Sequence, residues 1–290
     1  MRYLWFTSIC SVRALLIQIA LLASLASSAH AFEPLNTDDA GTLGKSVNQI
    51  EQYFYVLHNN VAGNPGGAST PGEEYRGLGN AKAFPLTFTH GLSESTELSI
   101  ATTYYATPRG SYSPITNNIL GLKWRFWGAG ERGLSMAIKP SITLPASTSQ
   151  QVQGLGLAKT NYELNYILSF YWDSFQVHSN ISYARNPYNT NYSISGTFSP
   201  YQVNLISGSI APVWIVNSWL KLALDIGSSI DTSSNAAAVN DYGMVAAIFR
   251  VNKDVDIGLS YLQNSTTPNN AWTSRGLASD RSEIGVTWRF

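Results

Sequence analysis

The sequence is poor in cysteine, in charge and in long apolar runs. Its single cysteine, Cys10, falls in an apolar leader, so the rest of the chain has no thiol for a disulfide, a nucleophile or a metal site. Charged residues make up 12% of the chain, about half the usual fraction for a soluble domain. After the leader, no apolar stretch reaches the ~18 residues that a transmembrane helix requires. These absences argue against a disulfide-stapled domain, a helical membrane protein and an ordinary soluble domain.

The leader, residues 1–31, has the three parts of a cleavable secretory signal. Arg2 and Arg13 precede a short apolar core, and small residues end it at Ala29-His30-Ala31. We expect the mature chain to start at Phe32, although a retained anchor is an alternative. Without the two leader arginines, the 18 basic residues fall to 16 against 18 acidic ones, a formal charge of −2. Nothing in this balance suggests a nucleic-acid partner.

The rest of the chain repeats segments of roughly ten residues in which apolar and polar residues alternate. This period-two pattern is typical of strands that present one face to lipid and the other to water. We therefore predict an all-β fold, a transmembrane up-and-down antiparallel β-barrel of about twelve strands. The expected strands lie at residues 47–57, 80–90, 96–105, 118–127, 134–144, 160–171, 175–185, 201–215, 219–229, 242–250, 255–263 and 281–290.

The connections between these segments are alternately long and short. Long polar loops such as His58–Gly79 are followed by short turns such as Gly91–Ser95. A barrel with short periplasmic turns and longer external loops has this order, which places both termini on the periplasmic side. A soluble β-sandwich offers no reason for such sorting. We expect residues 47–290 to form the barrel and residues 32–46 a periplasmic lead-in or plug; the first long loop could fold inward or remain in solvent.

Alternation also assigns each strand an outward and an inward face. In the fourth expected strand, Leu122 and Trp124 belong to the apolar outward set, and Lys123 and Arg125 belong to the inward set. Strand-end aromatic residues such as Trp172 suit the interfacial girdles of a membrane barrel.

Charged residues on the inward face have two possible roles. Glu97 could pair with Lys123 and Arg125, and Lys139 with Glu163, on adjacent strands inside the lumen. The same residues could instead line a narrow pore that discriminates between solutes. The pore-lining candidates are Glu51, Tyr53, Tyr55, Glu97, Tyr105, Lys123, Arg125, Lys139, Glu163, His178, Asp225, Glu283 and Arg289.

Two adjacent carboxylates, Asp38 and Asp39, stand between Thr37 and Ala40-Gly41. They could cap a turn, pair with lumen bases as a small plug, or donate oxygens to Ca²⁺. Since Ca²⁺ takes six or more oxygen ligands, one carboxylate pair is weak support for a metal site. We predict no metal and no cofactor.

The segment that begins Pro34-Leu35-Asn36-Thr37-Asp38-Asp39-Ala40-Gly41-Thr42 and ends at Lys45 resembles the opening of the outer-membrane family named for the meta-pathway of phenol degradation. His90–Leu98 resembles the first turn of that family, and Gly121-Leu122-Lys123 one of its strands. The resemblance implies a barrel in the bacterial outer membrane that passes or binds small, often hydrophobic or aromatic, compounds. It supplies no catalytic residues. The ending Trp288-Arg289-Phe290 resembles the C-terminal signal that the barrel assembly machinery recognises.

An enzymatic alternative is an outer-membrane phospholipase, because His178 and Ser179 resemble the His-x-Ser pattern of such barrels. Adjacent strand residues point to opposite faces, and His178 lies about 13 Å along the strand from Ser182, so neither pair could act as base and nucleophile.

We therefore predict a channel or facilitator for small, hydrophobic or aromatic compounds rather than an enzyme. A non-conducting structural or ligand-binding barrel is the alternative, and phospholipase comes third. The expected partners are membrane lipid, a small solute and, through Phe290, the assembly machinery.

Overall fold

The computed structural model describes residues 34–59, 75–77, 79–192, 203–232, 239–267 and 276–290. The expected signal segment, residues 1–31, lies outside the described residues, as does most of the first long loop. Among the described residues, no helix is long and apolar enough to cross a membrane.

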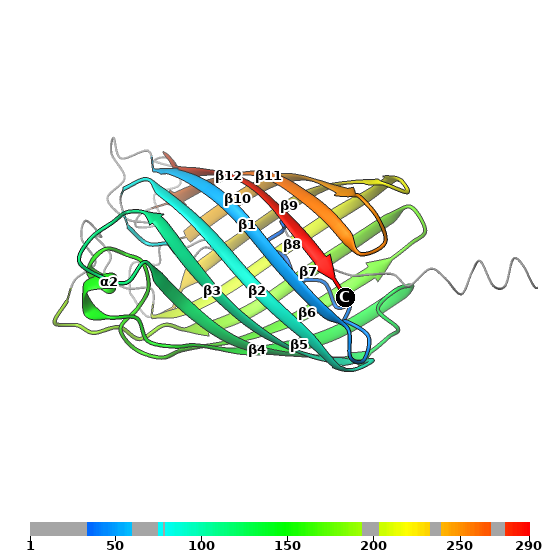
Figure 1. Ribbon diagram of the computed structural model, residues 1–290, viewed down its shortest axis with the longest axis horizontal. Coiled ribbons are helices and arrows are strands. Elements are labelled where there is room, and N and C mark those ends of the chain that lie inside the picture. Colours follow the sequence, from blue (N-terminus) through cyan, green and yellow to red (C-terminus); the bar gives the residue numbers. More distant parts are fainter. Residues whose placement is uncertain (1–33, 60–74, 78, 193–202, 233–238, 268–275) are drawn as a thin grey trace, which may run out of the picture.

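The described residues form twelve antiparallel strands that close into a barrel (Figure 1). Each strand pairs with its neighbour in the chain, and β12 pairs with β1 to complete the wall. The twelve-stranded barrel predicted from the sequence is confirmed, with strand ends shifted by a few residues. The strands are β1 (Asn48–Asn59), β2 (Ala81–Ser93), β3 (Thr96–Thr107), β4 (Ile115–Trp127), β5 (Gly133–Thr143), β6 (Asn161–Tyr171), β7 (Phe175–Arg185), β8 (Asn204–Asn217), β9 (Leu220–Asp231), β10 (Val239–Arg250), β11 (Val255–Thr267) and β12 (Gly276–Arg289).

The two ends of the barrel differ. The short turns lie at the end where β1 begins and where the chain ends, and the long connections lie at the other end (Figure 1). One long connection contains the helix α2 (Thr148–Val152), which the sequence analysis treated as loop. Ser147 and Gln150 form a reciprocal capping box that starts this helix.

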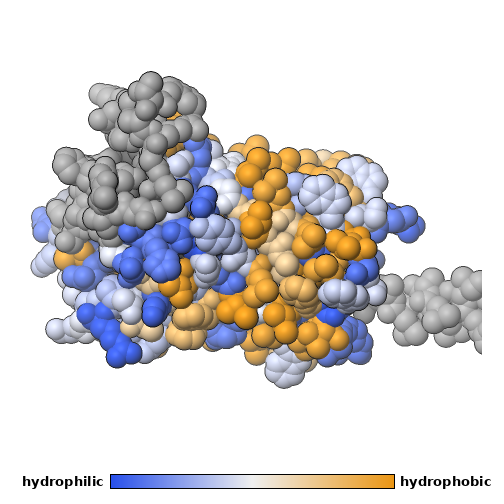
Figure 2. Space-filling view, turned by 90° about the horizontal axis from the view of Figure 1, so that it is seen from above, coloured by the Kyte–Doolittle hydropathy of each residue, from blue (hydrophilic) through white to orange (hydrophobic). Residues whose placement is uncertain are grey.

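The outer face carries the apolar set of each strand. On β4, Leu120, Leu122, Trp124 and Phe126 are between 39% and 48% exposed, whereas Lys123 between them is buried. Figure 2 shows hydrophobic residues gathered over the half of the visible face that is nearer the short turns, while hydrophilic residues cover the long-loop half. The predicted outward and inward sets of β4 are therefore confirmed, and the apolar region has the position of a lipid-facing belt.

The ladder between β1 and β2 is interrupted at Pro85. Pairing passes from Gln52–Leu86 to Tyr55–Ala83, and Pro85 has no N–H to donate to the ladder. On the outer face, the side-chain Nε2 of Gln52 donates to the carbonyl oxygens of Pro85, at 2.9 Å, and of Tyr53, at 3.0 Å. A polar side chain in the apolar belt thus satisfies the carbonyls at the break.

Candidate functional site: the lumen

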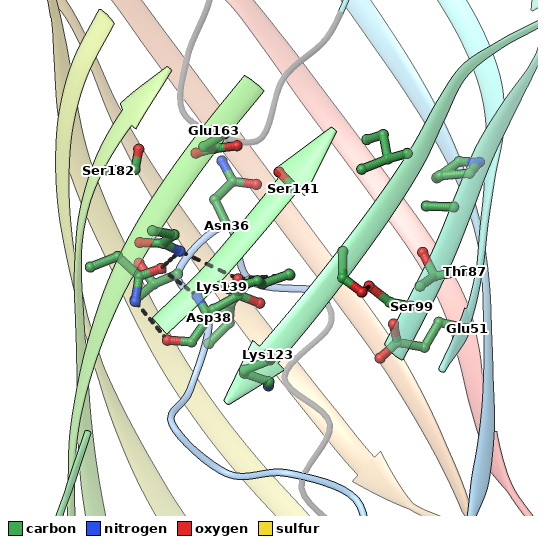
Figure 3. A pocket seen from close by; sticks show the side chains of 18 of the residues that line it. Asn36, Asp38, Glu51, Thr87, Ser99, Lys123, Lys139, Ser141, Glu163 and Ser182 are labelled. Carbon is green, nitrogen blue, oxygen red and sulfur yellow. Dashed lines mark hydrogen bonds and ion pairs between the residues drawn. The ribbon is translucent and has the colours of Figure 1, made fainter. Parts of the chain in front are cut away.

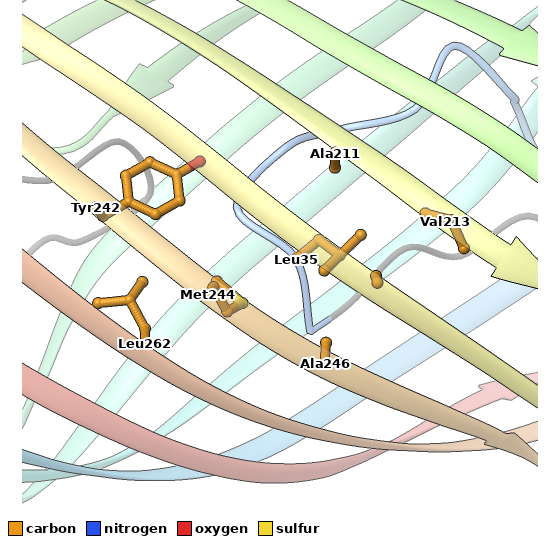
Figure 4. Close-up of a cluster of buried hydrophobic side chains, with 8 residues drawn as sticks. Leu35, Ala211, Val213, Tyr242, Met244, Ala246 and Leu262 are labelled. Atoms are coloured by element: carbon orange, nitrogen blue, oxygen red, sulfur yellow. The ribbon is translucent and has the colours of Figure 1, made fainter.

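The described part of the lead-in, residues 34–46, runs inside the barrel before β1 begins. Leu35 packs into a cluster of buried side chains on the inner wall (Figure 4). Its partners come from β8 to β11, so the lead-in enters the lumen on that side. The partners of Leu35 in this cluster are Ala211, Val213, Ala223, Tyr242, Met244, Ala246 and Leu262.

Asp225 on β9 anchors the next two residues of the lead-in. The backbone N–H groups of Asn36 and Thr37 donate to its Oδ2 at 2.8 and 2.9 Å, and the Thr37 hydroxyl donates to its Oδ1 at 2.7 Å. Tyr242 also donates to Oδ1, at 2.7 Å. Asp225 was predicted to line the pore, but its oxygens are used to hold the lead-in and it does not border the cavity described below.

Asp38 meets three strands in succession. Its backbone exchanges two hydrogen bonds of 2.8 Å with the side-chain amide of Asn180 on β7. Its carboxylate accepts hydrogen bonds from Lys139 Nζ of β5 at 2.9 Å and from Asn165 Nδ2 of β6 at 3.4 Å. Burial acts to raise the pKa of Asp38, but the positive charges of Lys139 and Lys123 outweigh it and hold that pKa below its usual value.

The partner of Lys139 corrects an expectation from the sequence. Lys139 was predicted to pair with Glu163, but it lies opposite Asn165, and Glu163 lies opposite Ser141. The carboxylate of Asp38 occupies the position beside Lys139. The strand pattern alone could not indicate this, because the competing carboxylate comes from the lead-in.

Lys123 on β4 joins the lead-in to β3. Its Nζ lies 3.0 Å from Glu97 Oε1 and 3.6 Å from Asp39 Oδ1. The predicted pair of Glu97 and Lys123 is therefore present, and Glu97 also accepts the backbone N–H of Leu43 at 2.7 Å. Tyr171 donates to the other carboxylate oxygen of Asp39 at 3.3 Å. Both carboxylates of the Asp-Asp pair thus contact side chains of the wall.

The last part of the lead-in passes closely over the turn between β2 and β3. The Thr42 hydroxyl donates to the carbonyl oxygen of Glu94, and the Ser46 N–H donates to that of Gly91. A Cβ atom on Gly91 would lie 2.1 Å from the carbonyl oxygen of Gly44, so only glycine permits this approach. From Asn36 to Ser46, the lead-in therefore follows the wall from β9 round to β2.

Between the lead-in and the opposite wall lies a cavity of about 330 Å³. It is bordered by charged groups, by hydroxyl groups and by two tyrosines. Figure 3 shows Glu51 and Glu163 on opposite sides of it, with Asp38, Lys123 and Lys139 between them. The predicted lining residues that border this cavity are Glu51, Tyr55, Glu97, Tyr105, Lys123, Lys139, Glu163 and Glu283.

Tyr53 and His178 were predicted to line the pore. Their side chains are buried against the inner face of the wall and do not border the cavity. The ring of Tyr53 covers Gly285, where an added Cβ would fall 2.2 Å from ring atoms. His178 is fully buried, with its Nδ1 2.8 Å from Ser169 Oγ. The neighbouring Ser179 donates to the Ser209 carbonyl oxygen, so the His-x-Ser pattern forms no base–nucleophile pair.

Arg125 and Arg289 were also predicted to line the pore and instead lie near the short-turn end. Arg125 donates to the backbone carbonyl oxygens of Ala129 and Glu94 in the turns. Arg289 donates to Asp256 at 2.8 Å. Both guanidinium groups have inward positions, but neither borders the cavity.

Arg281 was not among the predicted lining residues, although it borders the cavity. Its guanidinium lies 3.5 Å from Glu283 and 5.5 Å from the centre of the Tyr55 ring. Arg281 stands two positions before Glu283 on β12, so the period-two pattern contained the signal for it.

At the other end of the lumen, the described parts of the four long connections between β1 and β8 lie together and form what is called here the cap. Here Tyr75 of the first long loop packs on Tyr105, with ring centres 5.9 Å apart. Beside them, the two adjacent glutamines of α2 bind other loops: Gln150 Nε2 donates to the carbonyl oxygen of Ser113, and Gln151 Nε2 to that of Asn189. The buried apolar cluster under this cap consists of Tyr55, Leu57, Tyr75, Ala81, Ala83, Tyr105 and Leu155.

The described residues contain no group of three or more His, Cys, Asp or Glu side chains that could hold a metal ion. The lumen presents ion pairs, hydroxyl groups and aromatic rings around the cavity.

No family model matches the chain, and no curated protein matches it. Among solved structures, the chain is similar to an outer membrane channel from Pseudomonas putida F1, with a TM-score of 0.58 and 11% identity over 87% of this chain and 98% of that one. It is also similar to the NanC porin, with a TM-score of 0.49 and 12% identity over 84% and 99% of the two chains. The monoaromatic hydrocarbon channel CymD gives a TM-score of 0.46 and 8% identity over 86% and 89%. At 11% identity, the first similarity establishes a shared outer-membrane barrel fold.

Proposed function

We propose that the chain is a channel or facilitator in the bacterial outer membrane for small compounds, in particular hydrophobic or aromatic ones. The observation that carries this proposal is a cavity of about 330 Å³ enclosed by a wall whose outer face is apolar. A barrel that only anchors or braces the membrane needs no such space.

Two further observations support the proposal. The fold is shared with an outer membrane channel, and the opening from Pro34 to Lys45 resembles the family named for the meta-pathway of phenol degradation, to which we propose that the chain belongs. The aromatic side chains of Tyr55 and Tyr105 border the cavity at its capped end and offer rings for a planar solute. Membrane lipid surrounds the barrel in this proposal, and Phe290 serves as the assembly signal.

The second candidate is a non-conducting barrel with a binding or structural role. It is favoured by the lead-in, whose hydrogen bonds reach from β9 to β3 across the lumen, and by the loops tied together over the other end. If these contacts never release, solutes do not cross the barrel.

Solute flux into liposomes separates the two candidates. Vesicles carrying the refolded protein are compared with empty vesicles for entry of a small phenolic and of a sugar of similar mass. Selective entry of the phenolic supports the facilitator, and entry of both indicates a general pore. Entry of neither, with folding confirmed by electrophoretic mobility, rejects the channel in favour of the closed barrel.

A further inference from the structure

The cavity contains more carboxylates than cationic groups. Among the described residues that border it, the acidic side chains are six and the basic ones three. Each basic group is engaged: Lys123 with Glu97 and Asp39, Lys139 with Asp38, and Arg281 with Glu283. The carboxylates of Glu51 and Glu163 differ from the other four: among the described residues, no lysine or arginine nitrogen lies within 4 Å of their oxygens.

These two carboxylates face each other across the space. Glu51 projects from β1 beside Thr87, and Glu163 projects from β6 beside Ser182 (Figure 3). Gln49 Nε2 donates to one oxygen of Glu51 at 2.8 Å. Each therefore has capacity to accept hydrogen bonds from a group that enters the cavity.

The side-chain oxygen of Asn165, in the same lining, accepts no hydrogen bond. The Oδ1 of Asn165 is buried and has no hydrogen-bond partner, although its Nδ2 donates to Asp38 and Asn180. Asn165 is 9% exposed and stands two positions from Glu163 on the inward face of β6. A buried acceptor without a donor is a cost that a hydrogen-bond donor on a ligand would remove.

The aromatic part of the lining already accommodates a positive charge. The guanidinium of Arg281 lies 5.5 Å from the centre of the Tyr55 ring, within the range of a cation–π contact. Tyr105 packs in the same cluster, and both tyrosines border the cavity. One enclosed space thus offers unpaired carboxylates at its middle and aromatic rings toward its capped end.

We infer that this cavity is a binding site for small organic cations, solutes that carry an ammonium group close to an aromatic ring. The ammonium group is attracted by Glu51 and Glu163, which face each other across the cavity, and the ring lies against Tyr55 and Tyr105. Anions of the same size are disfavoured by the excess of carboxylates. The inference rests on the proposed function for its route of entry, but binding itself requires no transport.

The test measures binding by calorimetry to the full chain refolded in detergent micelles. Three probes share a phenol ring: tyramine carries an ammonium group, 4-ethylphenol is neutral and 4-hydroxyphenylacetate is an anion. We expect tyramine to bind about tenfold or more tightly than 4-ethylphenol, and the anion to bind most weakly, because one charge is added or reversed in a partly desolvated space.

The double variant Glu51→Gln/Glu163→Gln should lose most of the preference for tyramine and keep its affinity for 4-ethylphenol. Glu131→Gln, on an exposed turn, is the matched control and should change neither. Equal binding of the three probes, binding of none, or an unchanged preference in a folded double variant overturns the inference. If the double variant does not fold, the comparison of the three probes on the unmodified chain still tests the inference.

The liposome experiment tests the proposed function separately. Selective flux of a phenolic, without a preference for cations in the binding experiment, would support the channel and reject this cation site.

Discussion

Leu122 and Lys123 are consecutive residues of β4 that have opposite surroundings. Leu122 is 39% exposed on the apolar belt, and Lys123 is buried inside between Glu97 and Asp39. The alternation of side chains along a strand explains both positions. A change of charge at either residue therefore acts on a different part of the molecule.

We predict that Leu122→Lys lowers the yield of folded barrel in vesicles, because a cation on the lipid face costs about 2–4 kcal/mol at the membrane midplane. Lys123→Leu should leave barrel formation nearly intact, because the outer face of the barrel is unchanged, but it should raise ion conductance because Asp39 of the lead-in loses its contact with Lys123. Electrophoretic mobility measures the first effect and planar-bilayer recording the second. An equal loss of folding in both variants would contradict the assigned faces.

Asp38 provides a test that depends on pH. Its pKa in the folded protein lies below the ordinary 3.8, so its contribution to stability is fully present above pH 3.8 and is lost as pH falls through the lower value. Asp38→Asn should therefore reduce the urea midpoint of unfolding at neutral pH. The difference from the unmodified chain should shrink as pH falls below 3.8. Asp173→Asn, on an exposed turn, is the control for the loss of one carboxylate; a difference between Asp38→Asn and the unmodified chain that stays constant with pH would refute the role of Asp38.

At the scale of elements, the pairing of β1 with β2 is broken at a proline and completed by a side chain. A proline removes one donor from the ladder, and the outward side chain of Gln52 supplies a replacement. An amide in the apolar belt is unfavourable in isolation, but here its Nε2 has two carbonyl partners. The sequence therefore contains a coupled pair, Gln52 and Pro85, in different strands.

We predict that Gln52→Leu destabilises the barrel by about 1–2 kcal/mol although leucine is better suited to lipid, because two carbonyl oxygens lose a donor. Pro85→Val restores an N–H group to β2. In that background, Gln52→Leu should cost less, which gives a nonzero coupling energy in a double-mutant cycle. Urea unfolding of the four proteins in vesicles measures this coupling, and strictly additive effects would show that Gln52 does not compensate for Pro85.

At the scale of the whole molecule, different kinds of contact stand at the two ends of the lumen. The lead-in binds the wall with backbone N–H groups and carboxylates, whereas the cap joins loops through the side chains of α2. Gln151 is central to that cap: its Oε1 accepts the N–H groups of Ala158 and Asn189 at 3.0 Å. These contacts of Gln151 join loops and not strands, so they can loosen without opening the wall.

We predict that Gln151→Met frees the connection around Asn189 while leaving the urea midpoint of the barrel nearly unchanged. Chymotrypsin should then cut after Tyr188 and Tyr192 much faster than in the unmodified protein. Gln153→Met, whose side chain is exposed just after α2, is the matched control. Mass spectrometry of the fragments gives the rates; the same cleavage rate in all three proteins would contradict the role of Gln151.

How far the sequence predicts this molecule depends on the range of the interactions. Strand number and face follow from alternation within a few residues, as at Leu122 and Lys123, and both were predicted. The route of the lead-in depends on contacts such as that between Thr37 and Asp225, which are 188 positions apart. No local pattern indicates which base Asp38 meets, so the expected partner of Lys139 was wrong.

The packing of side chains against the inner face of the wall could not be predicted from the sequence either. Tyr53 was predicted to face a pore because it alternates correctly, but its ring covers a glycine on the neighbouring strand β12, opposite it in the register. The capping box of Ser147 and Gln150 was visible in the sequence, yet a five-residue helix is too short to produce a helical period.

The lead-in also constrains the order in which the protein is built. It is synthesised before every strand, but its first anchor, Asp225, lies near the far end of the chain, 189 positions from Asn36. The lead-in therefore cannot dock until β3 to β9 stand side by side, and its docking is a late event that requires a nearly complete wall. We expect Lys123, Lys139 and Asp225 to be hydrated until then, so that the closing barrel encloses water and loses part of it when the lead-in docks. A time-resolved label on the lead-in would accordingly report completion of the barrel and not its initiation.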